Sequence, residues 1–163
     1  MYKRQVAGTA ADLGQKLERA ASRLADPAVR KIKEVAGVYF FEEPLAQAGK
    51  LAFLFPGEGS QYVNMLSSLC LHFPEVRKWF DLIDRVFANH ARGYVPSDFI
   101  FPRPAFSDAE RAAAEKRLWQ LEGAFEAVLT ASWALYTLLS RLEIRPDALL
   151  GHSTGEYAAN SGV

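Results

Sequence analysis

The chain carries a serine between two glycines almost at its C-terminal end, in the run Gly151-His152-Ser153-Thr154-Gly155. Residues 145–150, which precede this run, are predicted to form a short buried strand, and a helix is predicted to begin at Glu156. A serine on so tight a strand-to-helix turn has strained backbone angles, so only small residues fit two positions to either side of it. The pattern therefore predicts that Ser153 is a nucleophile presented at the carboxyl edge of a sheet, with the two glycines as supporting residues.

The backbone after Ser153 adds to this predicted site. N–H groups at the start of a helix stabilise negative charge, so the N–H of Thr154 is a candidate donor to an oxyanion. The five-residue pattern also fits a solvated turn in a loop. The flanking strand and helix favour the nucleophile, because they are the structural context that the motif requires.

A second glycine-rich loop lies far upstream, after the apolar run Leu51–Phe55. It reads Pro56-Gly57-Glu58-Gly59-Ser60 and is predicted to be a turn. It lacks the lysine of a P-loop and the spacing of a dinucleotide-binding fingerprint. The order strand, helices, strand implies parallel strands, so both loops follow strand carboxyl ends, where open parallel sheets bind ligands. We therefore expect the two loops to meet at one site.

Together the two motifs resemble the acyltransferase domain of fatty acid and polyketide synthases, the malonyl-CoA:acyl carrier protein transacylase family. The resemblance covers residues 51–163, and the runs 55–66 and 71–76 resemble the iterative synthases that build polyunsaturated or enediyne chains. It implies an α/β fold with an α/β-hydrolase-like parallel sheet and flanking helices, here incomplete. It also implies transfer of a malonyl or related acyl group from CoA to the phosphopantetheine thiol of an acyl carrier protein, through an acyl-serine intermediate.

The resemblance assigns roles to individual residues. Ser153 matches the nucleophile, and the backbone N–H groups of Glu58 and Thr154 match the donors of the oxyanion hole. His152 matches the histidine that precedes the nucleophile, and the glycines of both loops match supporting residues. Many members carry glutamine where Glu58 stands, so we expect this carboxylate to face solvent or to cap its loop.

The resemblance places the catalytic histidine, the arginine that binds the malonyl carboxylate and a ferredoxin-like subdomain beyond Val163. We therefore expect the N-terminal part of such a domain, with the nucleophile and much of the oxyanion hole but without efficient turnover. The residues that select the acyl group are expected there too. The chain's own histidines, considered as substitute bases, are His72, His90 and His152. His152 adjoins Ser153, and the side chains of successive residues point apart.

Residues 1–48 are predicted to form a helical linker of the kind that joins a ketosynthase to an acyltransferase, and residues 49–163 the N-terminal portion of the acyltransferase domain. Apolar residues recur at three- and four-residue spacing over Thr9–Leu24, which predicts an amphipathic helix. The β-branched and aromatic run Val35–Phe41 predicts a strand. An ordinary N-terminal helix of the same domain is the alternative to the linker.

Helical patterns occupy most of the chain between the two motifs. Helices are predicted over residues 62–71 and 74–87, and a packed loop rich in proline and aromatic residues over 93–104. A capping box at Ser107–Glu110 begins a helical region that extends to Leu142 with a break near Gly123. Its second half is apolar nearly all round, which is typical of a helix buried against a sheet.

Composition excludes several other functions. The 19 basic and 19 acidic residues are dispersed and give a net charge of zero, so no nucleic-acid surface is expected. No cluster of residues has metal-ligand spacing, and no bound cofactor is expected. The resemblance implies acyl-CoA as a substrate. It also implies an acyl carrier protein and neighbouring synthase domains, such as a ketosynthase, as partners. The single cysteine, Cys70, is predicted to be a buried filler in a reducing compartment. No run is apolar enough for a membrane span and no secretory signal is visible, so a cytoplasmic enzyme part is expected.

Two further functions remain open. The same serine turn serves α/β serine hydrolases and thioesterases, which release the acyl group to water. The chain is alternatively a non-catalytic docking part of a synthase, in which Ser153 is idle.

Overall fold

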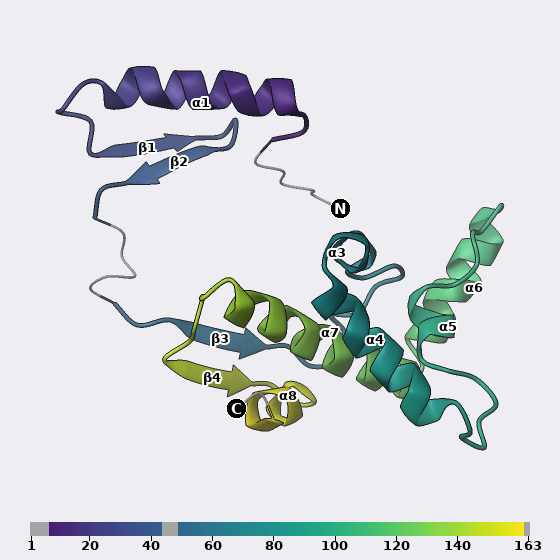
Figure 1. The fold of residues 1–163 in the computed structure, drawn as a ribbon. Coiled ribbons are helices and arrows are strands. Elements are labelled where there is room, and N and C mark those ends of the chain that lie inside the picture. The colour runs from purple at the N-terminus through teal and green to yellow at the C-terminus, as the bar shows by residue number, and fades with distance from the viewer. Residues whose placement is uncertain (1–6, 44–48, 162–163) are drawn as a thin grey trace. The chain divides into compact units, whose positions relative to one another are not determined.

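The computed structural model describes residues 7–43 and 49–161 (Figure 1). The chain divides into two compact units, Met1–Gly49 and Lys50–Val163. The predicted boundary between residues 48 and 49 borders residues 44–48, which lie outside the described residues. That the first unit is a linker between synthase domains stays a prediction.

The first unit contains one helix and a β-hairpin. Helix α1 (Ala10–Leu24) begins where the Thr9 hydroxyl accepts a hydrogen bond from the N–H of Asp12 at 3.1 Å, the interaction of a helix N-cap. The amphipathic helix predicted over residues 9–24 is therefore confirmed. Strands β1 (Lys31–Glu34) and β2 (Val38–Phe41) pair antiparallel.

The prediction of one strand over Val35–Phe41 is correct only for its second half. Val35 lies in the hairpin turn with its side chain fully exposed, and the preceding four residues form a strand that was not predicted. That strand contains a single apolar residue, the buried Ile32, so its sequence is too polar and too short to predict a strand. A guanidinium–carboxylate pair between Arg23 and Glu34, at 2.7 Å, joins the hairpin to α1.

The second unit is built on two short parallel strands. Strand β3 (Ala52–Phe55) pairs with β4 (Ala148–Gly151), so that Phe55 lies opposite Gly151 at their carboxyl ends. The predicted α/β arrangement of parallel strands with flanking helices is therefore confirmed. The helices are α3 (Ser67–His72), α4 (Pro74–Phe87), α5 (Ser97–Ile100), α6 (Asp108–Leu118) and α7 (Leu121–Arg141), with α8 (Gly155–Ser161) after β4.

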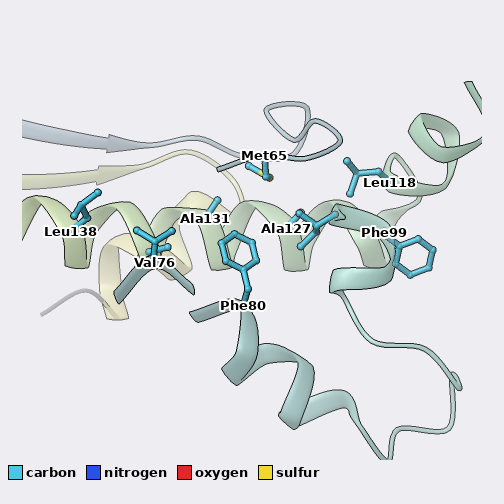
Figure 2. Close-up of a cluster of buried hydrophobic side chains, with 10 residues drawn as sticks. Met65, Val76, Phe80, Phe99, Leu118, Ala127, Ala131 and Leu138 are labelled. Carbon is cyan, nitrogen blue, oxygen red and sulfur yellow. The ribbon is translucent and has the colours of Figure 1, made fainter. Parts of the chain in front are cut away.

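Helices α4 and α7 form the core of this unit. Figure 2 shows Phe80 of α4 directed at the small residues of α7. The Phe80 ring also packs against Phe101 at a centroid distance of 5.1 Å. Beside it, the Trp79 and Trp133 rings lie 5.1 Å apart, and the Trp79 indole N–H donates to the Thr137 hydroxyl at 2.8 Å.

Three helix boundaries differ from the predictions. Residues 62–66 form turns before α3, because Asn64 and Leu66 have φ angles of 60° and 58°, which no right-handed helix contains. The long helical region breaks at Trp119 and Gln120, and Gly123 lies inside α7. The predicted loop over 93–104 contains the single-turn helix α5.

The capping box predicted at the start of α6 is confirmed. The Ser107 hydroxyl accepts from the N–H of Glu110, and the Glu110 carboxylate accepts from the N–H of Ser107, both at 3.2 Å. This reciprocal pair fixes the residue at which α6 begins.

One face of the parallel pair is covered by α7. Phe53 and Phe55 contact the Tyr136 ring at centroid distances of 6.1 and 6.2 Å, as expected for a helix buried against a sheet. Leu54 and Leu150, which point to the opposite face, are 75% and 57% exposed. An apolar groove of about 490 Å³ also runs between β3 and α7. The second unit therefore exposes apolar strand surface.

The helix α7, at 21 residues, is long for a protein of this size. Within the described residues, no helix, α7 included, combines the length and the apolar character that a membrane span requires.

The core predicts a large cost for truncating Phe80. Its side chain is 1% exposed, so Phe80→Ala removes buried apolar surface and leaves a cavity, and we expect the free energy of unfolding to fall by about 3–5 kcal/mol. Leu82→Ala, on the same helix at a side chain 44% exposed, should cost less than about 1 kcal/mol. Urea unfolding followed by circular dichroism measures both, and equal costs would contradict the core described here.

Candidate active site

Ser153 lies on the sharp turn between β4 and α8 (Figure 1). Its φ angle of 55° is in the left-handed region, which is strained for a residue with a side chain. Hydrogen bonds hold the turn: the N–H of His152 donates to the Phe55 carbonyl at 3.1 Å, and the N–H of Glu156 donates to the Ser153 carbonyl at 3.0 Å. The Ser153 residue itself is exposed. The sequence predicted such a strained, accessible position.

The turn is possible only because its two outer residues lack side chains. A methyl group at Gly155 would lie 2.7 Å from the carbonyl carbon of Phe55, closer than side-chain carbons approach backbone. A methyl group at Gly151 would overlap the backbone of Glu156. Helix α8 therefore begins in direct backbone contact with the end of β3.

This contact brings the second glycine-rich loop against the serine. Gly57 is buried, and a methyl group there would lie 3.0 Å from the Cβ of Ser153 and 2.9 Å from the His152 carbonyl. The two loops are almost a hundred positions apart in the sequence, and the structure places them side by side, as the parallel arrangement predicted.

Internal hydrogen bonds hold the loop after β3 in its shape. The Ser60 hydroxyl donates to the Gly57 carbonyl at 2.9 Å, and the N–H of Gly59 donates to the side-chain amide oxygen of Gln61 at 2.7 Å. Gln61 is only 4% exposed. This supporting role of Gln61 was not predicted from the sequence. The only signal there was a polar residue directly after the glycine-rich loop.

Each of the two loops that meet at Ser153 offers one backbone donor without an acceptor among the described residues. Within residues 7–43 and 49–161, neither the N–H of Glu58 nor that of Thr154 makes a hydrogen bond. One donor comes from each loop, and the loops meet at Ser153. This arrangement suits the stabilisation of an oxyanion, which needs donors that no other group occupies.

The side chains of these two residues differ in their surroundings. The Glu58 side chain is exposed, in agreement with the expectation that its carboxylate faces solvent. The Thr154 side chain is 7% exposed, and its buried hydroxyl finds no hydrogen-bond partner in the described part of the chain. A buried hydroxyl without a partner is costly, so this position carries a polar group that folding alone does not require.

None of the described histidines hydrogen-bonds to the Ser153 hydroxyl. The His152 ring is exposed and its Nδ1 lies against Gly57, 3.2 Å from a methyl group placed there. His90 Nδ1 instead accepts from the N–H of Arg92 at 3.3 Å, and His72 ends α3 on the surface. The described residues therefore supply a candidate nucleophile and donors without a general base in contact.

Cys70 packs at the edge of the apolar core but is only half-buried, so it is less buried than the sequence predicted. Burial raises the pKa of its thiol, which lowers the fraction of reactive thiolate. A search of the same described residues for three or more clustered metal-ligating side chains finds none.

A strained serine between a parallel strand and a helix, facing a glycine-rich loop with unoccupied N–H donors, is the arrangement of α/β-hydrolase-like enzymes that act through an acyl-serine. Comparison with known families agrees. The profile of the family described as "Acyl transferase domain" matches residues 52–162, and the chain belongs to this family.

Individual relatives support the assignment. The chain is 36% identical over 110 residues to a malonyl CoA-acyl carrier protein transacylase of Bacillus subtilis, an alignment that covers 68% of this chain and 30% of the relative. It is 26% identical over 127 residues to one subunit of the polyunsaturated fatty acid synthase of a Thraustochytrium species, covering 76% of this chain and 4% of that protein. The chain thus spans less than a third of the length of these relatives.

Among solved structures, the acyl transferase domain of ZmaA superimposes with a TM-score of 0.63 at 26% sequence identity. The match covers 87% of this chain and 30% of that one. The fold of this chain therefore corresponds to part of an acyltransferase fold, in agreement with the α/β class that the resemblance implied.

The contact between α8 and β3 predicts that Gly155 cannot be replaced. In Gly155→Ala the new methyl group meets the Phe55 backbone, which cannot move aside, and we expect a loss of about 3 kcal/mol or more in the free energy of unfolding. Gly59→Ala is the matched control, because its methyl group meets no atom within 4 Å and only its φ angle of 103° is strained. It should cost about 1 kcal/mol. Chemical unfolding measures both, and a stable Gly155→Ala protein would contradict the close approach.

The buried Thr154 hydroxyl, which has no hydrogen-bond partner among the described residues, gives a second prediction. Thr154→Val removes a buried polar group without a partner while keeping its shape, so the free energy of unfolding should stay the same or rise by about 1 kcal/mol. Thr137→Val is the control: it removes the acceptor of the Trp79 indole N–H and should cost about 1 kcal/mol. Thermal unfolding of both variants tests this, and a clear loss of stability in Thr154→Val would show that its hydroxyl has a structural partner.

Proposed function

We propose that this chain carries the nucleophile and oxyanion hole of an acyltransferase that moves a malonyl or related acyl group from CoA to an acyl carrier protein. The observation that carries the proposal is the meeting of the two loops at Ser153, with the N–H groups of Glu58 and Thr154 unoccupied. The name of the Bacillus subtilis relative supplies the acyl donor and acceptor.

In the proposed reaction the Ser153 hydroxyl oxygen attacks the thioester carbonyl of the acyl-CoA, and its proton passes to a base. The carbonyl oxygen becomes an oxyanion, which accepts hydrogen bonds from the N–H groups of Glu58 and Thr154. The carbon–sulfur bond then breaks, and CoA leaves as a thiol after taking a proton. The thiol of the carrier protein attacks the acyl-serine by the same steps in reverse and restores the serine hydroxyl.

This mechanism needs a general base at the Ser153 hydroxyl. Within residues 7–43 and 49–161, no histidine forms a hydrogen bond with that hydroxyl. We propose that the base and the group that binds the malonyl carboxylate come from outside these residues. The chain by itself should therefore form the acyl-serine slowly, because general-base catalysis contributes about 10²–10⁴ to such rates. No bound cofactor enters the proposed steps, since CoA is itself a substrate.

The setting of the domain is also a proposal. The match to the ZmaA acyl transferase domain extends over more of the chain than residues 52–162, so it includes part of the first unit. This supports a linker that accompanies acyltransferase domains in synthases, where it would join a ketosynthase. The similarity to part of a polyunsaturated fatty acid synthase supports an iterative synthase. We also propose a cytoplasmic location for this synthase.

The acyl-serine is tested by intact mass after incubation with malonyl-CoA between pH 7 and 9.5. We expect a malonyl adduct that forms slowly and whose rate rises about tenfold for each pH unit, because hydroxide must remove the serine proton in place of a protein base. The adduct should be absent from Ser153→Ala. A rate that stays constant over this pH range would show instead that a group of the protein acts as the base.

The same sample separates the alternative functions. An acyltransferase should lose its adduct faster when cysteamine, a small thiol that imitates the carrier, is added. A hydrolase or thioesterase would lose the adduct to water at the same rate without thiol. The proposal would be overturned by a folded chain that forms no adduct at any pH, or that forms the adduct equally in Ser153→Ala. The remaining alternative would then be a non-catalytic docking part of a synthase.

A further inference from the structure

One ion pair of the second unit is almost completely buried. The guanidinium of Arg92, in the loop after α4, donates to the carboxylate of Glu126 on α7, and the two side chains are 15% and 8% exposed. We call it the Arg92–Glu126 pair. Burying two charges often costs more free energy in lost hydration than their attraction returns, so two apolar side chains of similar volume would often be as stable or more stable. Stability alone therefore does not account for this pair.

The guanidinium of Arg92 is fixed in direction as well as in place. Its central carbon lies 4.3 Å from the centroid of the Phe87 ring and 4.9 Å from that of the Tyr94 ring. A planar cation that stacks on aromatic rings keeps one orientation. The backbone N–H of Arg92 also donates to His90 Nδ1 at 3.3 Å. Because Phe87 is the last residue of α4, the pair joins the end of α4 to α7.

The residue before Glu126 contacts the helix that follows Ser153. The Phe125 ring packs edge-on against Tyr157 of α8 at a centroid distance of 5.9 Å. The N–H of Tyr157 donates to the Thr154 carbonyl at 3.2 Å, at the start of α8. Through this contact the position of α7 affects the turn that holds the candidate nucleophile.

The second residue before Glu126 lies at the other loop of the candidate active site. Ala124 lines a small hollow together with Glu58 and Gly59, which belong to the loop after β3. Three consecutive residues of α7 therefore lie at the loop after β3, at α8 and at Arg92.

The start of α7 lacks the usual side-chain cap. Gln120 stands at the N-cap position, and its side chain makes no capping hydrogen bond with the described residues of the first turn. Helix ends without a cap fray more readily. Gly123 and Ala124, which follow, offer little side-chain surface for packing. The directional bond from Arg92 to Glu126 therefore fixes a helix start that its own residues leave loose.

We propose that Arg92 and Glu126 are positioning residues for the formation of the acyl-serine, which rests on the function proposed above. Their pair fixes α7 along its axis and about it. The residues before Glu126 then hold the two loops in one arrangement, with the backbone donors of the oxyanion hole at Ser153. Two apolar side chains would fill the same space without fixing one direction, and a displacement of about 1 Å is enough to slow a reaction substantially.

The double variant Arg92→Met/Glu126→Leu tests the proposal in the whole chain. It replaces the pair by apolar side chains of similar size, so the midpoint of urea unfolding should stay the same or rise. The rate of malonyl-serine formation, measured by intact mass with malonyl-CoA, should fall about tenfold or more, because misplaced donors stabilise the oxyanion less. A role in stability alone predicts the opposite, a lower midpoint with an unchanged rate for the folded molecules.

Arg77→Met/Asp81→Leu is the matched control, because it removes an ion pair from the surface of α4, where the two side chains are 61% and 46% exposed. It should leave the rate unchanged. If the double variant at the buried pair does not fold, Glu126→Gln takes its place. This change keeps the shape of the side chain and one acceptor, and the expected fall in rate is about threefold. An unchanged rate in the folded variant would overturn the positioning role.

Hydrogen exchange separates this proposal from the function on which it rests, because it needs no reaction. We expect the amides of residues 119–127 and 151–157 to exchange about tenfold faster in the variant, at an unchanged urea midpoint. If the wild-type chain forms no acyl-serine, faster exchange in both segments of the variant would overturn the proposed function alone. Unchanged exchange in these segments would overturn the positioning role, whether or not the acyl-serine forms.

Discussion

The contact of Gly155 with the Phe55 backbone is the constraint on which the site depends. It lets helix α8 begin against the end of β3, and so fixes the turn that carries Ser153 next to the loop that carries Gly57. A side chain at Gly155 would separate the two elements, and the serine would lose the neighbouring donors. Parallel pairing of β3 with β4 sets which ends meet, and the glycines set how closely they meet.

The strain at Ser153 has to be offset elsewhere in the second unit. Its φ angle of 55° costs of order 1–3 kcal/mol, which a short turn does not recover through its own hydrogen bonds. The packing of α7 does so indirectly. Tyr136 supports both phenylalanines of β3, and the other side of α7 packs on α4 around Phe80. The helices between the two loops, which contribute no predicted catalytic residue, therefore hold the strand against which the strained turn forms.

The sequence was informative where residue type and backbone geometry are strictly linked. The two loops could be placed because apolar runs end at glycines, and the capping box because Ser107 and Glu110 satisfy each other's backbone. It was uninformative where tertiary contacts decide. The strand Lys31–Glu34 shows only one fully buried residue, and the break before α7 falls at residues with ordinary helical propensity. The role of Gln61 depends on a hydrogen bond from Gly59 and on burial that the sequence does not indicate.

The acidic residue in the loop after β3, Glu58, illustrates how the backbone and the side chain of one residue can have different surroundings. A carboxylate near a developing oxyanion would oppose the reaction through Coulomb repulsion, which is large in a buried site and small across solvent. Because the Glu58 side chain is exposed, water screens its charge while its N–H stays available beside Ser153. A negative charge at this position is then compatible with the acyl transfer proposed above. The charge of the Glu58 side chain and the direction of its backbone N–H are therefore separate properties of one loop residue.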